Sequence, residues 1–198
     1  FQIAYTDVSD KWRMPASHYA HSAENVDFFA LNTHSMMFPN ASLAEEYEAQ
    51  RTWIAGALAE EQAADRWRVV YGHHPYRSNG EHGNAGAFDG LPDTLDLSGI
   101  SLKEDFEASV CGRADLYVCG HDHDREWFVE GCGGTELIVS GAGSKLRTFE
   151  DTQPTHFADA SIEGFVWIEI DDEVLTLQFW NRDGVMEYEG GWERSSPR

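Results

Sequence analysis

The chain has 198 residues, of which 41% are hydrophobic and 13% aromatic, so it can bury a sizeable core and is not a disordered tail. Its 35 acidic residues outnumber its 14 basic ones, and a net charge of -21 without any Lys/Arg cluster argues against nucleic acid or anionic lipid as a partner. No run of about 18 apolar residues occurs, so we expect no transmembrane helix.

The beginning of the chain has no features of a targeting segment. Residues 1–10 lack the charged and apolar regions of a signal peptide, and the chain does not start with Met. We therefore expect a mature or truncated protein, and the sequence leaves the destination of the intact precursor open.

The first half of the chain predicts a parallel strand–helix–strand unit. Residues 26–32 form a mostly apolar run of strand length, and residues 67–71 form another, ended by a glycine. Between them, residues 42–64 carry apolar side chains at helical spacing. Ser42 followed by Glu45 resembles a capping box and marks the expected start of this helix.

The second half predicts a long loop and then mostly strands. The loop covers residues 75–99, a plausible helix covers 102–110, and a short buried strand covers 116–119. Further strands are expected at 127–129, 137–139, 165–170 and 174–180. Three tryptophans in these patterns are expected to pack in the core: Trp127, Trp167 and Trp180. Alternating α/β followed by antiparallel β predicts an α/β fold, a layered β-sandwich flanked by helices, in a single domain spanning 1–198.

A His-x-His motif follows the strand predicted at 116–119. Side chains at i and i+2 can converge on one side of an extended or turning segment, so His121 and His123 are candidate metal ligands. Asp122 and Asp124 are expected to orient the two imidazoles as second partners. An isolated motif of this kind is also compatible with a polar surface turn.

A second Gly-His pair follows the strand at 67–71. His73 and His74 therefore lie at a strand's carboxyl end, as His121 does, and sites collect at such ends in α/β sheets. Because neighbouring residues on a strand face opposite sides, we expect only one of His73 and His74 to enter a common site. His82, in a Gly-Glu-His-Gly segment, either reaches over a substrate or is a solvated loop histidine.

Four motifs together resemble a known family. Gly-His-x-Pro at 72–75, Glu-His-Gly at 81–83, Leu-Tyr-Val-Cys-Gly-His-Asp-His at 116–123 and Ile-Val-Ser-Gly-Ala-Gly at 138–143 occur in this order. They are similar to the second half of calcineurin-like metallophosphoesterases, above all the small, mammalian-type purple acid phosphatases. The resemblance extends to about residue 180 and implies the carboxy-terminal portion of an α/β/β/α catalytic domain whose amino-terminal part is missing.

The resemblance also implies roles for individual residues. His73 and His121 would bind a divalent metal, and His123 would bind the ferric ion of a dinuclear centre, Fe(III) with Zn, Mn or Fe(II). His82 would contact the phosphate of a phosphate-ester substrate and help to protonate the leaving oxygen. No ligand role is carried over to His74.

The carboxylate, Tyr and Asn ligands of the family have no counterpart in this chain. Three neutral histidines do not easily hold two cations about 3.5–4 Å apart, because their repulsion needs anionic ligands to offset it. We therefore expect the missing amino-terminal segment to be supplied in cis or by another chain. The intact protein would be an acid phosphatase-like phosphomonoesterase, and the 198-residue chain alone would be inactive.

Two alternatives come from other classes of protein. The first is a non-catalytic binding or structural module derived from the same fold. The second is a closed, inert zinc site of four ligands: Cys119, His121, His123 and Cys132. The three cysteines also allow one disulfide, such as Cys111 with Cys132, or none. Since similar enzymes are usually secreted, the resemblance favours a secreted or periplasmic protein.

Overall fold

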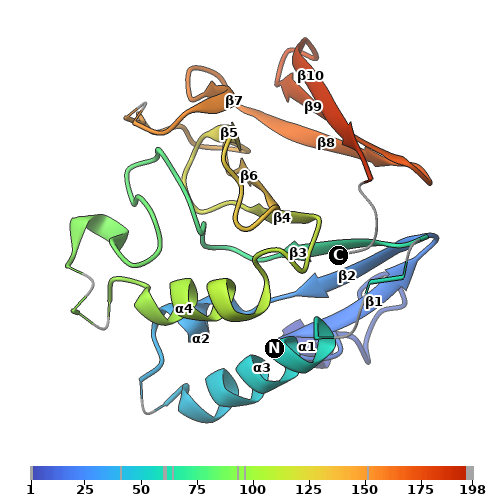
Figure 1. Cartoon of the computed structure of the whole chain (residues 1–198), viewed down its shortest axis with the longest axis vertical. Helices are drawn as coiled ribbons and strands as arrows, with labels where there is room; N and C mark the ends of the chain where they lie inside the picture. The colour runs from blue at the N-terminus through green and yellow to red at the C-terminus, as the bar shows by residue number, and fades with distance from the viewer. Residues whose placement is uncertain are drawn as a thin grey trace.

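The computed structural model describes residues 2–40, 42–59, 62–63, 65–92, 94–95, 97–150 and 152–194. Two sheets form its framework (Figure 1), one of seven strands in the order β1-β2-β3-β4-β6-β5-β7 and one of three in the order β10-β9-β8. The strands of the larger sheet are β1 Tyr19–Ala23, β2 Val26–Ala30, β3 Trp67–Tyr71, β4 Leu116–Cys119, β5 Arg125–Phe128, β6 Glu136–Ser140 and β7 Thr155–Asp159. Those of the smaller sheet are β8 Gly164–Ile170, β9 Val174–Asn181 and β10 Met186–Glu193.

The centre of the larger sheet is parallel and its edges are antiparallel. β2, β3, β4 and β6 run parallel to one another, whereas β1, β5 and β7 pair in the antiparallel sense. The helices are α1 Gln2–Tyr5, α2 Thr33–Met37, α3 Ala44–Ala57, the short 3-10 helix η1 Phe88–Gly90, and α4 Ile100–Ser109. The predicted parallel unit is confirmed as β2, α3 and β3, and the bounds predicted for β3 and β4 are those observed.

The predicted capping box at Ser42 is wrong. Both the backbone N–H and the hydroxyl of Ser42 donate to Oδ1 of Asn40, at 3.1 and 2.6 Å, so the serine is used in a turn before the helix. Leu43 occupies the N-cap position without a side-chain bond, and α3 ends at Ala57 instead of residue 64. Three strands, β1, β7 and β10, were not predicted, since their polar or glycine-containing sequences give weak strand signals.

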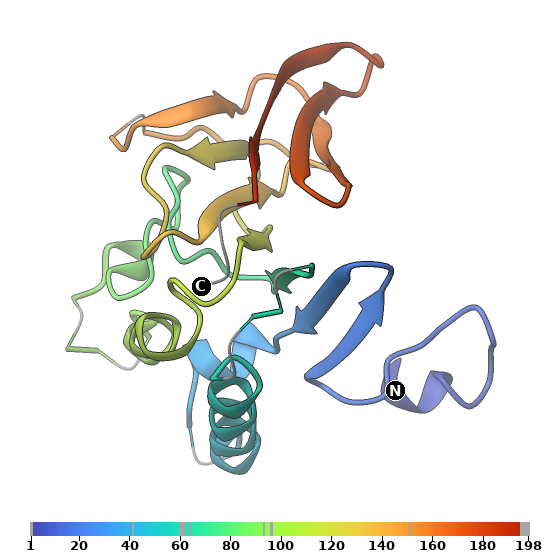
Figure 2. The ribbon, with the colours of Figure 1, turned by 45° about the vertical axis from the view of Figure 1, so that its right-hand side comes forward.

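Two apolar clusters hold three layers together. One lies between the helices and the larger sheet and includes Phe29, Ile54, Val70, Phe106 and Tyr117. The other lies between the two sheets and includes Trp67, Leu116, Trp127, Leu177 and Phe179. Figures 1 and 2 show this order, with α3 and α4 on one side of the larger sheet and β8–β10 on the other. The predicted fold class, a layered β-sandwich with helices outside, is confirmed.

The outer face of the smaller sheet carries no helix among the described residues. Along β8, Val166, Ile168 and Ile170 pack against the cluster between the sheets, as their alternation predicted. The residues between them face outward, so Phe165 is 50% exposed and Trp167 is 56% exposed. The predicted packing role of Trp167 is therefore wrong, because it lies on the opposite face of the strand.

A disulfide joins Cys111, just after α4, to Cys132, just before β6. The two Cα atoms are 4.9 Å apart and 21 residues apart in sequence, while Cys119 is a free, buried thiol. Because the sulfur of Cys132 forms the disulfide, it cannot bind a metal, and the alternative zinc site that included Cys132 is wrong.

Replacing both Cys111 and Cys132 by Ser is expected to lower the free energy of unfolding by about 2–4 kcal/mol, since the cross-link restricts the unfolded chain. Denaturant unfolding of the variant and of the wild type, each with and without reductant, measures the change. Reductant is expected to shift only the wild type, and an unchanged midpoint in the variant would contradict a stabilising role.

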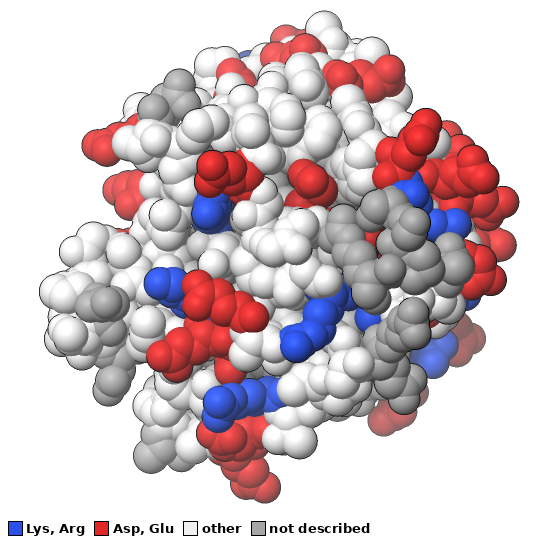
Figure 3. Space-filling model, in the orientation of Figure 1, with Lys and Arg blue, Asp and Glu red and all other residues white. Residues whose placement is uncertain are grey.

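The surface is dominated by acidic side chains. On the face in Figure 3, Asp and Glu are more frequent than Lys and Arg, in keeping with the net charge of -21. Within the described residues, no helix has the length and apolar character needed to span a bilayer.

Candidate metal centre

The site begins where two neighbouring parallel strands end. β3 and β4 are paired in parallel, so their carboxyl ends meet at one edge of the sheet. The pairing continues past the strands, because Gly72 N–H donates to the Val118 carbonyl and Gly120 N–H donates to the His73 carbonyl, both at 3.1 Å. The residues after these glycines, His73 and His121, are thereby brought together.

His73 and His121 point nitrogen atoms at one another. Nε2 of His73 lies 2.9 Å from Nδ1 of His121, and the two rings are nearly perpendicular, at 88°. The contact has the length of an N–H···N hydrogen bond, in which one ring nitrogen donates and the other accepts. Loss of that proton to a metal would leave two neighbouring nitrogens that one ion can bind with a small opening of the pair.

His74 also enters this cluster, against the expectation that only one of the two adjacent histidines would. One nitrogen from each of His73, His74 and His121 lies within 4.8 Å of the others. The Thr33 hydroxyl oxygen accepts the amide N–H groups of His73 and His74, both at 3.1 Å. Because both lone pairs of this oxygen are used, the hydroxyl donates its single hydrogen to Nδ1 of His74, 2.9 Å away. A neutral His74 then carries its proton on Nε2 and has no lone pair for a metal, so we assign it no ligand role.

Burial keeps these imidazoles neutral. Burial, together with a smaller contribution from neighbouring histidines, lowers the pKa of His121 to about 4 and that of His74 to about 3. Burial and the nearby His123 also lower the pKa of His73. Because a metal competes with the proton for the same nitrogen, the depressed values keep His73 and His121 available as ligands in mildly acidic solution.

The turn after β4 has an unusual backbone. His121 has a φ of 67°, in the left-handed region. The turn is also packed tightly, since a Cβ at Gly141 would collide with the carbonyl oxygen of Asp122. The glycines of the motif at 138–143 thus have a structural reason, because they let the chain approach the turn at His121 closely.

The His-x-His motif lies in this turn, and convergence of its two side chains was predicted for an extended or a turning segment. His123 is not in the three-nitrogen cluster, and among the described residues its ring stacks on no other ring and its buried Nδ1 has no hydrogen-bond partner. Burial lowers the pKa of His123, as do Arg147 and Lys145. Its role as an iron ligand stays a prediction.

His82 lies against the cluster. Its ring centroid is 4.3 Å from that of His121, and it stacks on Phe88 at 5.5 Å. Nδ1 donates to the carboxylate of Asp89, and Nε2 lies 3.5 Å from Nη1 of Arg147. Within this part of the chain His82 is held from both sides, which does not fit a freely solvated loop histidine.

Buried carboxylates hold the loop that carries His82. Asp122 accepts hydrogen bonds from the Ser78 hydroxyl and from the backbone N–H of His82, the latter at 3.2 Å. Glu126 accepts the backbone N–H of Asn79 at 3.1 Å.

Asp122 and Asp124 were expected to orient the imidazoles, and no hydrogen bond of the described residues does so. Asp122 binds the loop instead, and Oδ1 of Asp124 has no hydrogen-bond partner. Sequence spacing gave no sign of Asp89, which contacts His82 instead.

Burial also shifts the carboxylic acids that follow the turn. It raises the pKa of Asp124 to about 7, with a contribution from the charge of Asp122, and raises that of Glu126 to about 9, with a contribution from Asp124. Glu126 is therefore protonated and neutral near pH 7, which removes part of the charge that would otherwise be buried behind the loop.

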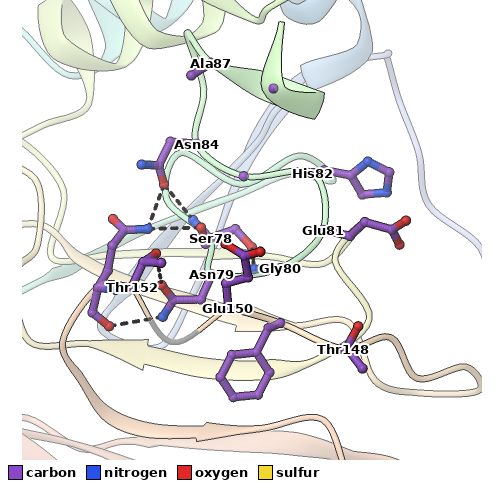
Figure 4. Close-up of a pocket in the computed structure, with 14 residues that line it drawn as sticks. Ser78, Asn79, Gly80, Glu81, His82, Asn84, Ala87, Thr148, Glu150 and Thr152 are labelled. Carbon is purple, nitrogen blue, oxygen red and sulfur yellow. Dashed lines mark hydrogen bonds between the residues drawn. The ribbon is translucent and has the colours of Figure 1, made fainter.

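A cavity of about 550 Å³ opens beside His82. Its walls are the loop 78–84 and residues 148–150, 152 and 153, together with Ala87 and Gly90. Figure 4 shows His82 and Glu81 projecting away from a hydrogen-bonded group that includes Ser78, Asn79 and Asn84. Among the four clustered histidines, only His82 lines this cavity.

The chain is similar to known phosphatases in sequence. No protein-family model matches it. Tartrate-resistant acid phosphatase type 5 of Oryctolagus cuniculus is 25% identical over 208 residues, which cover 92% of this chain and 59% of that protein. Purple acid phosphatase 17 of Arabidopsis thaliana is 38% identical over 80 residues, 40% of this chain and 20% of that protein. The chain thus spans less than two thirds of the length of these relatives.

Two solved structures share the fold. GAP50, the anchor in the inner membrane complex of Plasmodium, has a TM-score of 0.71 and 18% identity over 98% of this chain and 61% of its own. The purple acid phosphatase PPD1 from seeds of yellow lupin, Lupinus luteus, has a TM-score of 0.62 and 18% identity over 90% of this chain and 33% of its own. At this identity the likeness concerns the fold alone.

Proposed function

Because the chain is related to the small purple acid phosphatases and corresponds to the carboxy-terminal part of their metallophosphoesterase fold, we propose that the intact protein hydrolyses phosphate monoesters at a metal centre. The observation that carries the proposal is the 2.9 Å separation of His73 Nε2 and His121 Nδ1, with His82 beside them. A non-catalytic module is not favoured, since the sequence relatives named above are phosphatases.

The residues present suit a metal. His73 and His121 are neutral, share one edge of the sheet and offer two nitrogens to one ion, which we propose to be Zn, Mn or Fe(II). His123, with its buried and unpartnered Nδ1, is proposed to bind Fe(III). When bound, the two ions neutralise the phosphate oxygens and activate the attacking water.

His82 is proposed to donate the proton to the leaving oxygen. Asp89 accepts the hydrogen bond from Nδ1 and thereby fixes the ring, so Nε2 is the nitrogen that carries the exchangeable proton. The stacked ring of Phe88 limits the motion of the imidazole, and Asp122 fixes its backbone. Nη1 of Arg147, which is paired with Glu81, donates a long hydrogen bond to Nε2 at 3.5 Å, so this contact must be released when Nε2 carries the proton for the leaving oxygen.

The remaining ligands are proposed to come from sequence outside this chain, in cis or from another chain, which completes a single catalytic domain. Anionic ligands from that segment would offset the repulsion of two cations, which histidines alone do not. The Cys111–Cys132 disulfide supports an oxidising compartment, and we propose a secreted or periplasmic protein.

The test uses the intact protein from its native source. Elemental analysis and hydrolysis of p-nitrophenyl phosphate are measured before chelation, after chelation and after metal is restored. Activity is expected to fall by about 100-fold or more on chelation and to return with the metals. The 198-residue chain alone serves as the matched control and is expected to show no turnover. Turnover by that chain, or full activity without metal, would refute the proposal.

A further inference from the structure

The cavity beside His82 has no assigned occupant. We propose that it holds the alcohol part of the phosphate ester, and that it selects a neutral, hydroxyl-rich alcohol such as a sugar or a polyol. This inference rests on the proposed function and adds the class of substrate to it.

The position of His82 decides which part of the substrate lies in the cavity. A general acid must reach the oxygen that joins phosphorus to the alcohol. On one side His82 contacts His121 of the cluster, at 4.3 Å between ring centroids, and on the other side it lines the cavity. If a phosphate binds at the cluster, its alcohol would then lie beside His82, at the edge of this cavity.

The walls of the cavity are fixed in advance by side-chain amides (Figure 4). Oδ1 of Asn79 accepts from the Thr152 hydroxyl at 3.2 Å and from the Gln153 backbone N–H at 2.9 Å. Oδ1 of Asn84 accepts from the Ser78 backbone N–H and from Nε2 of Gln153, both at 3.0 Å. Since these bonds join the loop 78–84 to Thr152 and Gln153, little ordering of this wall is required when a ligand enters.

The polar groups of the cavity wall that these bonds do not use are suited to bind the hydroxyl groups of an alcohol. Nδ2 of Asn84 and Oε1 of Gln153 have no protein partner in the described part of the chain, and the carboxylate of Glu150 is exposed. One donor and several acceptors match hydroxyl groups, which both donate and accept. The half-buried ring of Phe149 lines the same cavity and offers an apolar surface to the C–H face of a sugar.

Charge argues against an alcohol with a second anionic group. Among the described residues that line the cavity there is neither Lys nor Arg, whereas Glu81 and Glu150 are present. Glu81 is paired with Arg147 at 2.5 Å, and within the described part of the chain Glu150 has no cationic partner. A single exposed carboxylate attracts an ammonium group only weakly, so we expect neutral polyols to be better alcohol groups than amino alcohols.

The test measures how fast the intact, metal-containing protein hydrolyses a set of matched phosphate esters. Glycerol 1-phosphate, 3-phosphoglycerate, propyl phosphate and ethanolamine phosphate have similar size but differ in hydroxyl groups and charge. We expect kcat/KM for glycerol 1-phosphate to exceed each of the others by about 10-fold. Equal values, or a preference for any of the other three, would overturn the inference.

A pair of charge-reversal variants tests the cavity itself. Glu150→Lys is expected to raise kcat/KM for 3-phosphoglycerate relative to glycerol 1-phosphate by about 10-fold. Glu169→Lys makes the same change of charge on the outer face of β8 and is expected to leave this ratio unchanged. A ratio that moves equally in both variants would mean that net charge, and not the cavity, sets the preference. p-Nitrophenyl phosphate is assayed in parallel: if it is not hydrolysed, the proposed function fails and this inference with it, whereas hydrolysis without selectivity overturns only the inference.

Discussion

Replacing His121 by Asn is expected to lower the affinity of the intact protein for Zn²⁺ by about 100-fold or more, with a parallel loss of phosphatase activity. His121 supplies Nδ1 at 2.9 Å from Nε2 of His73, and without it only one of the two paired nitrogens remains. Asn is preferred to Ala in this test because residue 121 has a φ of 67°, which Asn tolerates better than most residues. The change in affinity then reports the ligand and not a strained turn.

Competition between the protein and a fluorescent chelator measures the Zn²⁺ affinity. His21→Asn is the matched control, since His21 is exposed on β1 and stacks on Phe28 away from the cluster. Equal affinities of wild type and His121→Asn would show that His121 is not a ligand. Equal losses in both variants would point to a general effect of removing a histidine.

The second large effect is expected from His82→Gln, which is predicted to lower kcat by about 10²- to 10⁴-fold while metal content stays unchanged. Gln keeps a polar side chain beside Asp89 but cannot carry the proton to the leaving oxygen. The loss is expected to be large for alkyl phosphates, whose alcohols need protonation, and small for dinitrophenyl phosphate, whose phenolate leaves without a proton.

This dependence on the leaving group separates proton donation from a merely structural role, which would lower the rates of both esters alike. Elemental analysis of the purified variant completes the test. A fall in metal content would make His82 a ligand, and equal losses for both esters would rule out its role as general acid.

The strands that carry the site, and the edge of the sheet where it lies, were predictable from sequence. The directions of the side chains beyond the strand ends were not. Apolar runs ended by glycine located β3 and β4, and the rule that sites collect at carboxyl ends of strands placed His73 and His121 at one edge. The alternation of side chains failed for His74, which enters the cluster beside His73 because the chain has already left the sheet at this position.

Partners distant in sequence were also beyond prediction. Thr33 decides the tautomer of His74 across 41 residues, and Asp122 contacts Ser78 across 44. No local spacing indicates such pairs, because they depend on how the loops are folded back over the sheet. The same is true of the helix start, where Asn40 competes for Ser42 through a turn.

The grip of Asp122 and Glu126 on the loop 78–82 has a practical consequence for engineering. Both acids belong to the stretch that carries His121 and His123, so the proposed metal ligands and the proposed proton donor depend on one support. Redesign of that stretch would disturb both at once. Changes of substrate range are better sought on the opposite wall of the cavity, at residues 148–150, 152 and 153.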